Sequence, residues 1–297
     1  MEDDSGPRRE LSVGVVVTNY ETWELTRRCL DAVARLGGAD EVIVVDDGSK
    51  TPPPPGIEDQ ARLLLNGENR GLCASLNRGV QACTADVVVL FDSDAYPLVE
   101  LSGLRTDFAA DPLLAVVGFA TVGTGGRPTA SWEREPDVLG LVLGQRLDAI
   151  RRRLLPGSPD DDLSVFTCAM AVRREAFLAA GGFDEAFDWL DLDHDLSMRL
   201  RRAGYHLKVR PDLLAFHEGG GAPQATSARV LRSYKNRWLL LRKHGKLRRT
   251  TLVRTLVLLR LRTEWLALKL GAALWDRWTE KAQGRRALIR WCAENYR

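Results

Sequence analysis

The sequence has no Cys-x-x-Cys pair, no internal repeat and no uncharged run of the roughly eighteen residues that a membrane helix needs. Its five cysteines are odd in number and widely spaced, so neither a disulfide framework nor a zinc site is implied. The first ten residues are charged and lack the apolar core of a signal peptide. These absences favour a cytoplasmic protein in a reducing compartment that neither crosses a membrane nor is exported.

The charge of the chain is distributed unevenly. The net charge is +2 over 297 residues, yet residues 245–297 hold 13 Lys and Arg against 4 Asp and Glu, a net of +9. Residues 1–244 therefore carry −7. Because this body is acidic and no recognition motif accompanies the basic tail, the pattern argues against nucleic-acid binding.

Apolar runs rich in valine alternate with segments of helical spacing. This alternation predicts an α/β domain with a mostly parallel sheet flanked by helices. Strands are predicted at residues 11–17, 42–45, 61–65, 87–91, 114–122 and 165–172. Helices are predicted at residues 23–36, 71–82, 136–155, 174–180 and 190–203.

Polar side chains directly follow three of these strands. Residues 18–20, 46–47 and 92–94 stand at strand carboxyl ends, which is where parallel sheets bind ligands. Asp92 and Asp94, two carboxylates one residue apart, can hold a hard divalent cation against the phosphates of a substrate. Asp-Ser-Asp is also typical of a plain turn, so its interpretation depends on its neighbours.

The order and spacing of several separated segments resemble the family 2 glycosyltransferases. The likeness covers roughly residues 11–242. It implies the GT-A fold and an inverting enzyme that uses a nucleotide-diphosphate sugar. The matching segments are VVVTNY (15–20), VIVVDDGS (42–49), NRG (69–71 and 77–79), DSD (92–94), GGFDE (181–185), DHDL (193–196), RL (199–200) and His217.

The resemblance implies a donor site in the first half of the chain. Thr18 and Tyr20 match positions that line the nucleotide base and ribose, a role that a hydroxyl and an aromatic face suit. Asp47 matches the residue that accepts a hydrogen bond from the base, and the identity of the base stays open. Arg70 would place a cation near the phosphates, although a solvated loop arginine is the competing interpretation.

The resemblance also implies a divalent metal, Mn²⁺ or Mg²⁺. Asp94 is the leading ligand, Asp92 assists through the ribose or a bound water, and His217 matches a late histidine that often completes the site. An imidazole beside carboxylates favours Mn²⁺. The metal would neutralise charge on the departing diphosphate.

An inverting transfer needs one carboxylate to take the proton of the acceptor hydroxyl. The family commonly has Glu-Asp at the start of the helix predicted at residues 190–203, and the alignment places Leu192 and Asp193 there. Asp193 is therefore the candidate base. Asp191 is the rival, because a shift of two residues is easy in a loop with three acids, some of which simply cap the helix. Trp189 would stack on an acceptor sugar or pack against the protein.

Residues 252–278 are rich in leucine but are interrupted every few residues by Arg or Lys. The segment is too charged to span a bilayer and suits a helix lying on a membrane surface. A helical hairpin that packs on the core or on another subunit, and a flexible basic tail, are the alternatives. The predicted organisation is a flexible N-terminus (1–10), a GT-A domain (11–242) and a basic amphipathic helical extension (243–297).

Together these features predict a metal-dependent inverting glycosyltransferase. The acceptor hydroxyl would belong to a saccharide, a lipid-linked saccharide or a small metabolite. Peripheral contact with the inner face of the membrane, or a homo-oligomer formed through the C-terminal helices, completes the expected partners. A sugar nucleotidyltransferase would favour a Gly-rich phosphate loop after the first strand, which residues 18–22 lack. A non-catalytic nucleotide-sugar-binding or scaffold protein stays open because Leu192 replaces the Glu.

Overall fold

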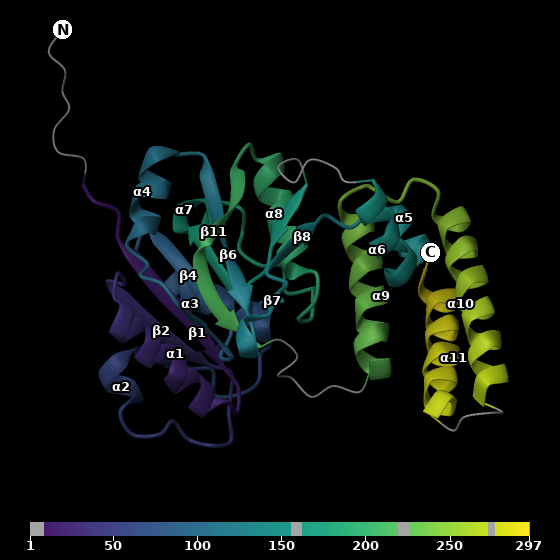
Figure 1. Ribbon diagram of the computed structural model, residues 1–297, viewed down its shortest axis with the longest axis horizontal. Coiled ribbons are helices and arrows are strands. Elements are labelled where there is room, and N and C mark those ends of the chain that lie inside the picture. The colour runs from purple at the N-terminus through teal and green to yellow at the C-terminus, as the bar shows by residue number, and fades with distance from the viewer. Residues whose placement is uncertain (1–8, 156–161, 219–225, 273–276, 297) are drawn as a thin grey trace, which may run out of the picture. The chain divides into compact units, whose positions relative to one another are not determined.

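The computed structural model describes residues 9–155, 162–218, 226–272 and 277–296 (Figure 1). The described residues fall into two compact units. Most of the N-terminal segment predicted at residues 1–10 lies outside the described residues. The sheet unit consists of residues 9–134 and 162–218, and the helical unit consists of residues 135–155, 226–272 and 277–296.

The main sheet contains β1 (Val13–Asn19), β2 (Glu41–Asp46), β3 (Arg62–Leu65), β4 (Val87–Phe91), β5 (Ala95–Pro97), β6 (Leu114–Val122), β7 (Pro128–Thr129), β10 (Ala169–Arg173) and β11 (His206–His217). Their order is β3-β2-β1-β4-β10-β6-β11-β5, with β7 paired to β6. β5, β7 and β10 are antiparallel to their neighbours, and the remaining pairs are parallel. A separate two-stranded sheet joins β8 (Trp132–Arg134) to β9 (Leu163–Val165).

Helices flank this sheet, so the predicted α/β architecture with a mostly parallel sheet is confirmed (Figure 1). The observed bounds of one predicted helix (23–36) and two predicted strands (87–91 and 114–122) match the prediction to the residue. The helices of the sheet unit are α1 (Trp23–Leu36), α2 (Ile57–Gln60), α3 (Leu72–Ala82), α4 (Gly103–Ala110), α7 (Arg174–Ala179) and α8 (Leu192–Arg202).

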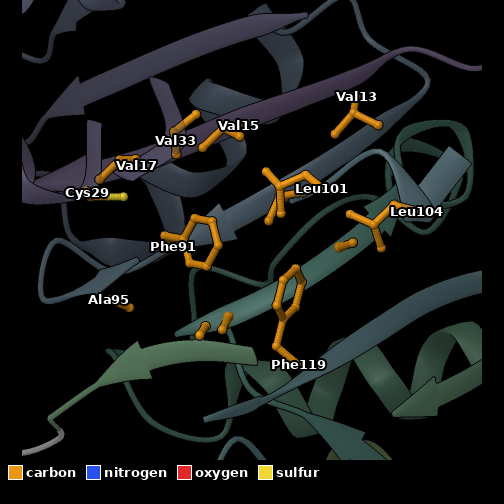
Figure 2. Close-up of a cluster of buried hydrophobic side chains, with 14 of the residues drawn as sticks. Val13, Val15, Val17, Cys29, Val33, Phe91, Ala95, Leu101, Leu104 and Phe119 are labelled. Atoms are coloured by element: carbon orange, nitrogen blue, oxygen red, sulfur yellow. The ribbon is translucent and has the colours of Figure 1, made fainter. Parts of the chain in front are cut away.

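The centre of the sheet is buried on both faces. Every residue of β1 and β4 is buried, as uninterrupted apolar strands require. Val13, Val15 and Val17 join one hydrophobic cluster with side chains of α1, α4 and β4 (Figure 2). In that cluster the rings of Phe91 and Phe119 meet edge to face with centroids 5.7 Å apart.

Helix α3 covers the opposite face through a close approach at Gly79. A Cβ placed on Gly79 would lie 2.4 Å from Cγ1 of Val16 and 3.1 Å from Cγ2 of Val45. The missing side chain therefore lets the helix backbone rest directly on β1 and β2.

The strand predicted at residues 165–172 is wrong as a single element. β9 ends at Val165 and β10 begins at Ala169. Between them is a turn in which the N–H of Ala169 donates to the carbonyl of Phe166 at 3.4 Å. The turn lies within an apolar run, and apolar periodicity alone cannot reveal it.

The helix predicted at residues 136–155 is also divided in two. α5 (Val138–Leu143) and α6 (Gln145–Leu154) meet at Gly144, whose φ of 78° ends the first helix. No strand was expected at residues 206–217, where the structure has β11. The polar stretch at residues 210–212 interrupts its apolar pattern, and the pairing with β6 shifts register there.

The helical unit contains α5, α6, α9 (Thr226–Lys243), α10 (Thr250–Ala272) and α11 (Arg277–Asn295). α10 and α11 lie side by side, so the basic tail forms a helical hairpin rather than a flexible segment (Figure 1). The predicted boundary between residues 242 and 243 falls inside the last turn of α9. None of the helices in the described ranges is both long and apolar enough to cross a membrane. The buried core of this unit is Leu141, Trp238, Leu241, Val253, Val257, Leu258, Leu261, Leu288, Cys292 and Tyr296.

We predict that Gly79→Ala lowers the free energy of unfolding by about 1–3 kcal/mol, because the added methyl group overpacks the contact with β1. The matched control is Gly103→Ala in α4, where a Cβ meets nothing within 4 Å. This control should change stability by less than about 0.5 kcal/mol. Chemical denaturation measures both, and equal effects of the two substitutions would refute the close approach.

Candidate active site

The candidate site lies at the edge of the sheet where the parallel strands end. β1 pairs with β2 and β4, so residues 18–20, 46–47 and 92–94 come to the same edge. The antiparallel β10 starts there as well, because Ala169 pairs with Phe91. The pairing of β5 with β11 sets His217 opposite Ala95, next to the acidic turn.

Asp92, Asp94 and His217 form a group that could hold a metal ion. One potential ligand atom from each residue lies within 4.8 Å of the others. Nε2 of His217 is 3.7 Å from Oδ1 of Asp94. Two carboxylates with one imidazole suit Mn²⁺ or Mg²⁺.

The same group contains polar atoms that the described protein leaves unpaired. Oδ1 of Asp92 and Nδ1 of His217 are buried without a hydrogen-bond partner among the described residues. Burial, together with repulsion from Asp94 and Asp193, raises the pKa of the Asp92 carboxyl to about 7. A cation here would satisfy the orphaned oxygen and offset the repulsion, so these residues fit a divalent metal.

Asp193 lies in the first turn of α8, close enough to Asp92 to raise its pKa. Its Oδ1 accepts a hydrogen bond from the backbone N–H of Thr167 at 3.0 Å. Burial raises the pKa of Asp193 to about 6, although His194 and Thr167 act in the opposite direction. A carboxyl group with a pKa in this range, beside residues that could hold a metal ion, is suited to act as a general base.

Asp191 stands at the start of the same helix, α8. It is the N-cap residue of α8 with a φ of 64°, and its carbonyl accepts a hydrogen bond from the N–H of Asp195 at 3.0 Å. Its Oδ1 lies 4.0 Å from Nε2 of His194, which is also 2.9 Å from Oε1 of Glu133. The negative charge of Asp191 raises the pKa of Asp193, the candidate base.

The third acid of this loop is structural. Asp195 has no exposed surface and pairs with Nε of Arg199 at 2.7 Å. Arg199 in turn donates to the carbonyls of Ala180 and Gly182. This ion pair therefore fixes the start of α8 against the segment that follows α7.

Trp189 precedes these acids in a strained part of the loop. Its φ of 75° and the φ of 64° at Asp191 both lie in the left-handed region, which costs about 1–2 kcal/mol for a non-glycine residue. The Trp189 side chain is partly buried. Loops that keep such strain are often functional, so the position is compatible with an acceptor contact.

The ends of β1 and β2 are joined by Asn19, to which the sequence prediction gave no role. Nδ2 of Asn19 donates to Oδ1 of Asp46 at 2.7 Å, and its Oδ1 accepts from Thr26 at 2.8 Å. Asn19 therefore ties the ends of β1 and β2 together. Thr18 beside it is buried, whereas Tyr20 is 48% exposed and presents an accessible ring.

Asp47 supports the turn that carries Arg70. Its Oδ1 accepts hydrogen bonds from Nδ2 of Asn66 and the N–H of Arg70, both at 2.8 Å, and its Oδ2 accepts from the N–H of Gly71 at 2.9 Å. A carboxylate has about four acceptor positions, so Oδ2 retains capacity for a further donor such as a base N–H. The Arg70 residue is exposed.

Thr167 and Cys168 lie at the site but have no place in the sequence prediction. Burial, followed by the charges of Asp92, Asp193 and Asp94, raises the pKa of the Cys168 thiol well above its usual value. Treating residues 165–172 as one strand concealed both residues. The available signal was a polar Thr-Cys pair inside an otherwise apolar run.

Two solved structures share this architecture. The mannosyltransferase PcManGT from Pyrobaculum calidifontis, in complex with GDP-Man and Mn²⁺, has a TM-score of 0.58 at 18% identity and covers 98% of this chain and 88% of its own. GalNAc-T7 with UDP, GalNAc and Mn²⁺ has a TM-score of 0.55 at 16% identity over 77% of this chain and 49% of that one. The class of protein is therefore defined as one with the GT-A fold.

The sequence comparisons identify the family within that class. The model described as Glycosyl transferase family 2 matches residues 12–180, so the chain belongs to glycosyltransferase family 2. The pre-mycofactocin glycosyltransferase of Mycobacterium tuberculosis is 32% identical over 223 residues, which is 72% of this chain and 44% of that protein. The undecaprenyl-phosphate 4-deoxy-4-formamido-L-arabinose transferase of Pseudomonas savastanoi is 31% identical over 134 residues, 41% of this chain and 37% of that protein. The chain thus spans less than half of these relatives' length.

The raised pKa of Asp92 predicts that this residue destabilises the metal-free fold. The folded pKa of about 7 exceeds the ordinary value of 3.8, so stability is lost as pH rises through this window. Asp92→Asn should therefore raise Tm by about 3–10 °C at pH 8 in EDTA and have little effect below pH ~4.

The control for this prediction is Glu68→Gln, which removes an exposed acid of the same unit and should leave Tm unchanged at both pH values. Differential scanning fluorimetry measures all three proteins. A lower Tm for Asp92→Asn at pH 8 would contradict the electrostatic picture of the site.

Proposed function

We propose that this chain transfers a sugar from a nucleotide-diphosphate sugar to an acceptor hydroxyl, with inversion at the anomeric carbon and with a divalent metal, Mn²⁺ or Mg²⁺. The observation that carries the proposal is that Asp193 lies close enough to the candidate metal ligands to raise the pKa of Asp92. A donor diphosphate and a base are needed on either side of one reacting carbon, and these residues supply a position for each.

The donor would be held by the residues at the ends of β1, β2 and β4. The exposed ring of Tyr20 is available for stacking on the base, and Oδ2 of Asp47 has capacity for a base N–H. Asp94, His217 and Asp92 would hold the metal, which would stabilise negative charge on the departing diphosphate.

The chemistry assigned to this chain is removal of one proton. The acceptor O–H gives its proton to the Asp193 carboxylate while the oxygen bonds to the anomeric carbon and the bond from that carbon to the diphosphate breaks. Leu192, at the position where the family commonly has Glu, is fully buried. One carboxylate suffices for a single displacement, so the loss of that Glu is compatible with activity.

The acceptor belongs to one of three kinds: a saccharide, a lipid-linked saccharide or a small metabolite. The names of the two relatives refer to pre-mycofactocin and to undecaprenyl-phosphate, so they do not favour one of these kinds over the others. Trp189, which precedes Asp191 and Asp193 along the chain, would contact the acceptor. A cytoplasmic location, with peripheral contact to the inner face of the membrane, fits the scattered cysteines and the basic tail.

The base assignment predicts different results for two neighbouring acids. Asp193→Asn should lower kcat by about 10²–10⁴-fold with little change in donor KM, whereas Asp191→Asn should stay within about tenfold of the wild type. Because the Asp193 pKa is about 6, wild-type kcat should fall as pH drops below about 6, or below a lower value with the metal bound. Full turnover by Asp193→Asn together with loss of turnover in Asp191→Asn would identify Asp191, and not Asp193, as the base.

The donor assignment is tested by thermal shift with UDP-, GDP- and dTDP-sugars, each with and without Mn²⁺. A donor present at about 100 times its Kd should stabilise the fold by about 2.7 kcal/mol, and the shift should require Mn²⁺. Tyr20→Ala should reduce this shift, and Leu113→Ala, an exposed apolar residue next to the start of β6, is the control. The absence of a shift with every nucleotide sugar would overturn the proposed donor class.

A further inference from the structure

Helix α10 presents an apolar stripe to solvent. Five leucines along it are spaced by four, three, seven and four residues, so they share one face of the helix. They are Leu252 (49% exposed), Leu256 (40%), Leu259 (59%), Leu266 (51%) and Leu270 (74%).

The opposite face of α10 is the one used by the fold. Val253, Val257 and Leu261 belong to the buried core of the helical unit. The helix is therefore apolar on two sides. The five leucines of the stripe lie outside the buried core of the helical unit. Exposed apolar patches of this extent mark surfaces that bind a partner.

Cations border the leucine stripe along one side. Arg262 and Lys269 are seven residues apart, both exposed, and lie next to Leu259 and Leu266 on the helix surface. A half-open depression of about 270 Å³ runs along the same side, lined by Arg254, Thr255, Leu258, Leu259 and Arg262. The Arg254 guanidinium donates to the carbonyl of Ala293, so the exposed Arg262 is the cation that this depression offers to a phosphate ester.

Helix α6 of the same unit has a similar pattern. Its exposed apolar residues Leu147 (55%), Ile150 (55%) and Leu154 (72%) also share one face. The exposed Arg146 and Arg153 lie next to them.

The helix that precedes α6 is the one that packs against α10. Nε of Arg260 in α10 donates to the carbonyl of Val142 in α5 at 2.6 Å. A Cβ on Gly144, the residue between α5 and α6, would lie 2.6 Å from Nη1 of the same arginine. The stripe of α6 therefore belongs to the same helical unit, one helix away from α10 along the chain.

We propose that α10 docks the helical unit onto an anionic phospholipid surface. The leucines would enter the boundary between headgroups and acyl chains, and the exposed Arg262 and Lys269 would contact lipid phosphates. A second copy of the chain is a poorer match. The acidic residue of α10, Glu264, already pairs with Arg260 and Arg285, so this face offers cations but no free carboxylate to an identical face.

Vesicle co-sedimentation of the full chain tests the docking surface. At about 0.1 M salt, the wild type should bind vesicles containing phosphatidylglycerol at least about tenfold more tightly than pure phosphatidylcholine. Leu259→Gln with Leu266→Gln should weaken binding at least about tenfold. Arg262→Gln with Lys269→Gln should weaken binding to the anionic vesicles by about fivefold per charge.

The matched control is Leu65→Gln with Leu113→Gln, two leucines of the sheet unit that are 54% and 51% exposed. This control should bind as the wild type does, and circular dichroism should show equal folding of all variants. No donor or metal is present, so the result is independent of the proposed sugar transfer.

Equal binding by the leucine variant and the wild type, or no preference for anionic vesicles, overturns the proposal. So does a wild-type dimer in sedimentation equilibrium that becomes monomeric in Leu259→Gln with Leu266→Gln while vesicles are not bound. That last result would assign the stripe to a second copy of the chain.

Discussion

The candidate active site contains a repulsion between carboxylates that the described residues do not relieve. Asp92, Asp94 and Asp193 are close enough that two of these carboxylates raise the pKa of the third, and one oxygen of Asp92 is buried without a hydrogen bond. Such an arrangement destabilises the fold unless a cation is present. We infer that these residues are placed for ligand binding rather than for stability.

Strand order explains how distant segments reach this point. The antiparallel β10 enters between β4 and β6, so the turn before it brings Thr167 to Asp193. The pairing of β5 with β11 carries His217 back to the acidic turn. Asn19 ties the end of β1 to the end of β2 through Asp46, and Asp47 holds the turn at Arg70. The buried apolar core of the sheet holds these strand ends in register, so the geometry of the site follows from the packing of the sheet.

Much of this arrangement is predictable from sequence where the signal is local. The apolar runs at residues 87–91 and 114–122 define strands to the residue, and the acidic Asp92 to Asp94 segment lies at a strand end because the strand stops there. The proximity of His217 to Asp94 is not predictable from local sequence, because it depends on the pairing of β5 with β11. The polar interruption in β11 conceals this strand from its apolar pattern. The role of Asp195 is equally concealed, because only the fold shows its carboxylate buried against Arg199. The roles assigned to the site residues, those of Asp94, Asp193 and His217 included, stay predictions.

The central claim is that Asp92, Asp94 and His217 bind a divalent metal that is required for the donor. Its most direct measurement is titration of Mn²⁺, monitored by electron paramagnetic resonance, in the presence of a nucleoside diphosphate. The account predicts bound Mn²⁺ in the wild type and an affinity at least about tenfold weaker in Asp94→Asn, because a charged ligand is lost. Equal Mn²⁺ affinity in the two proteins would contradict it.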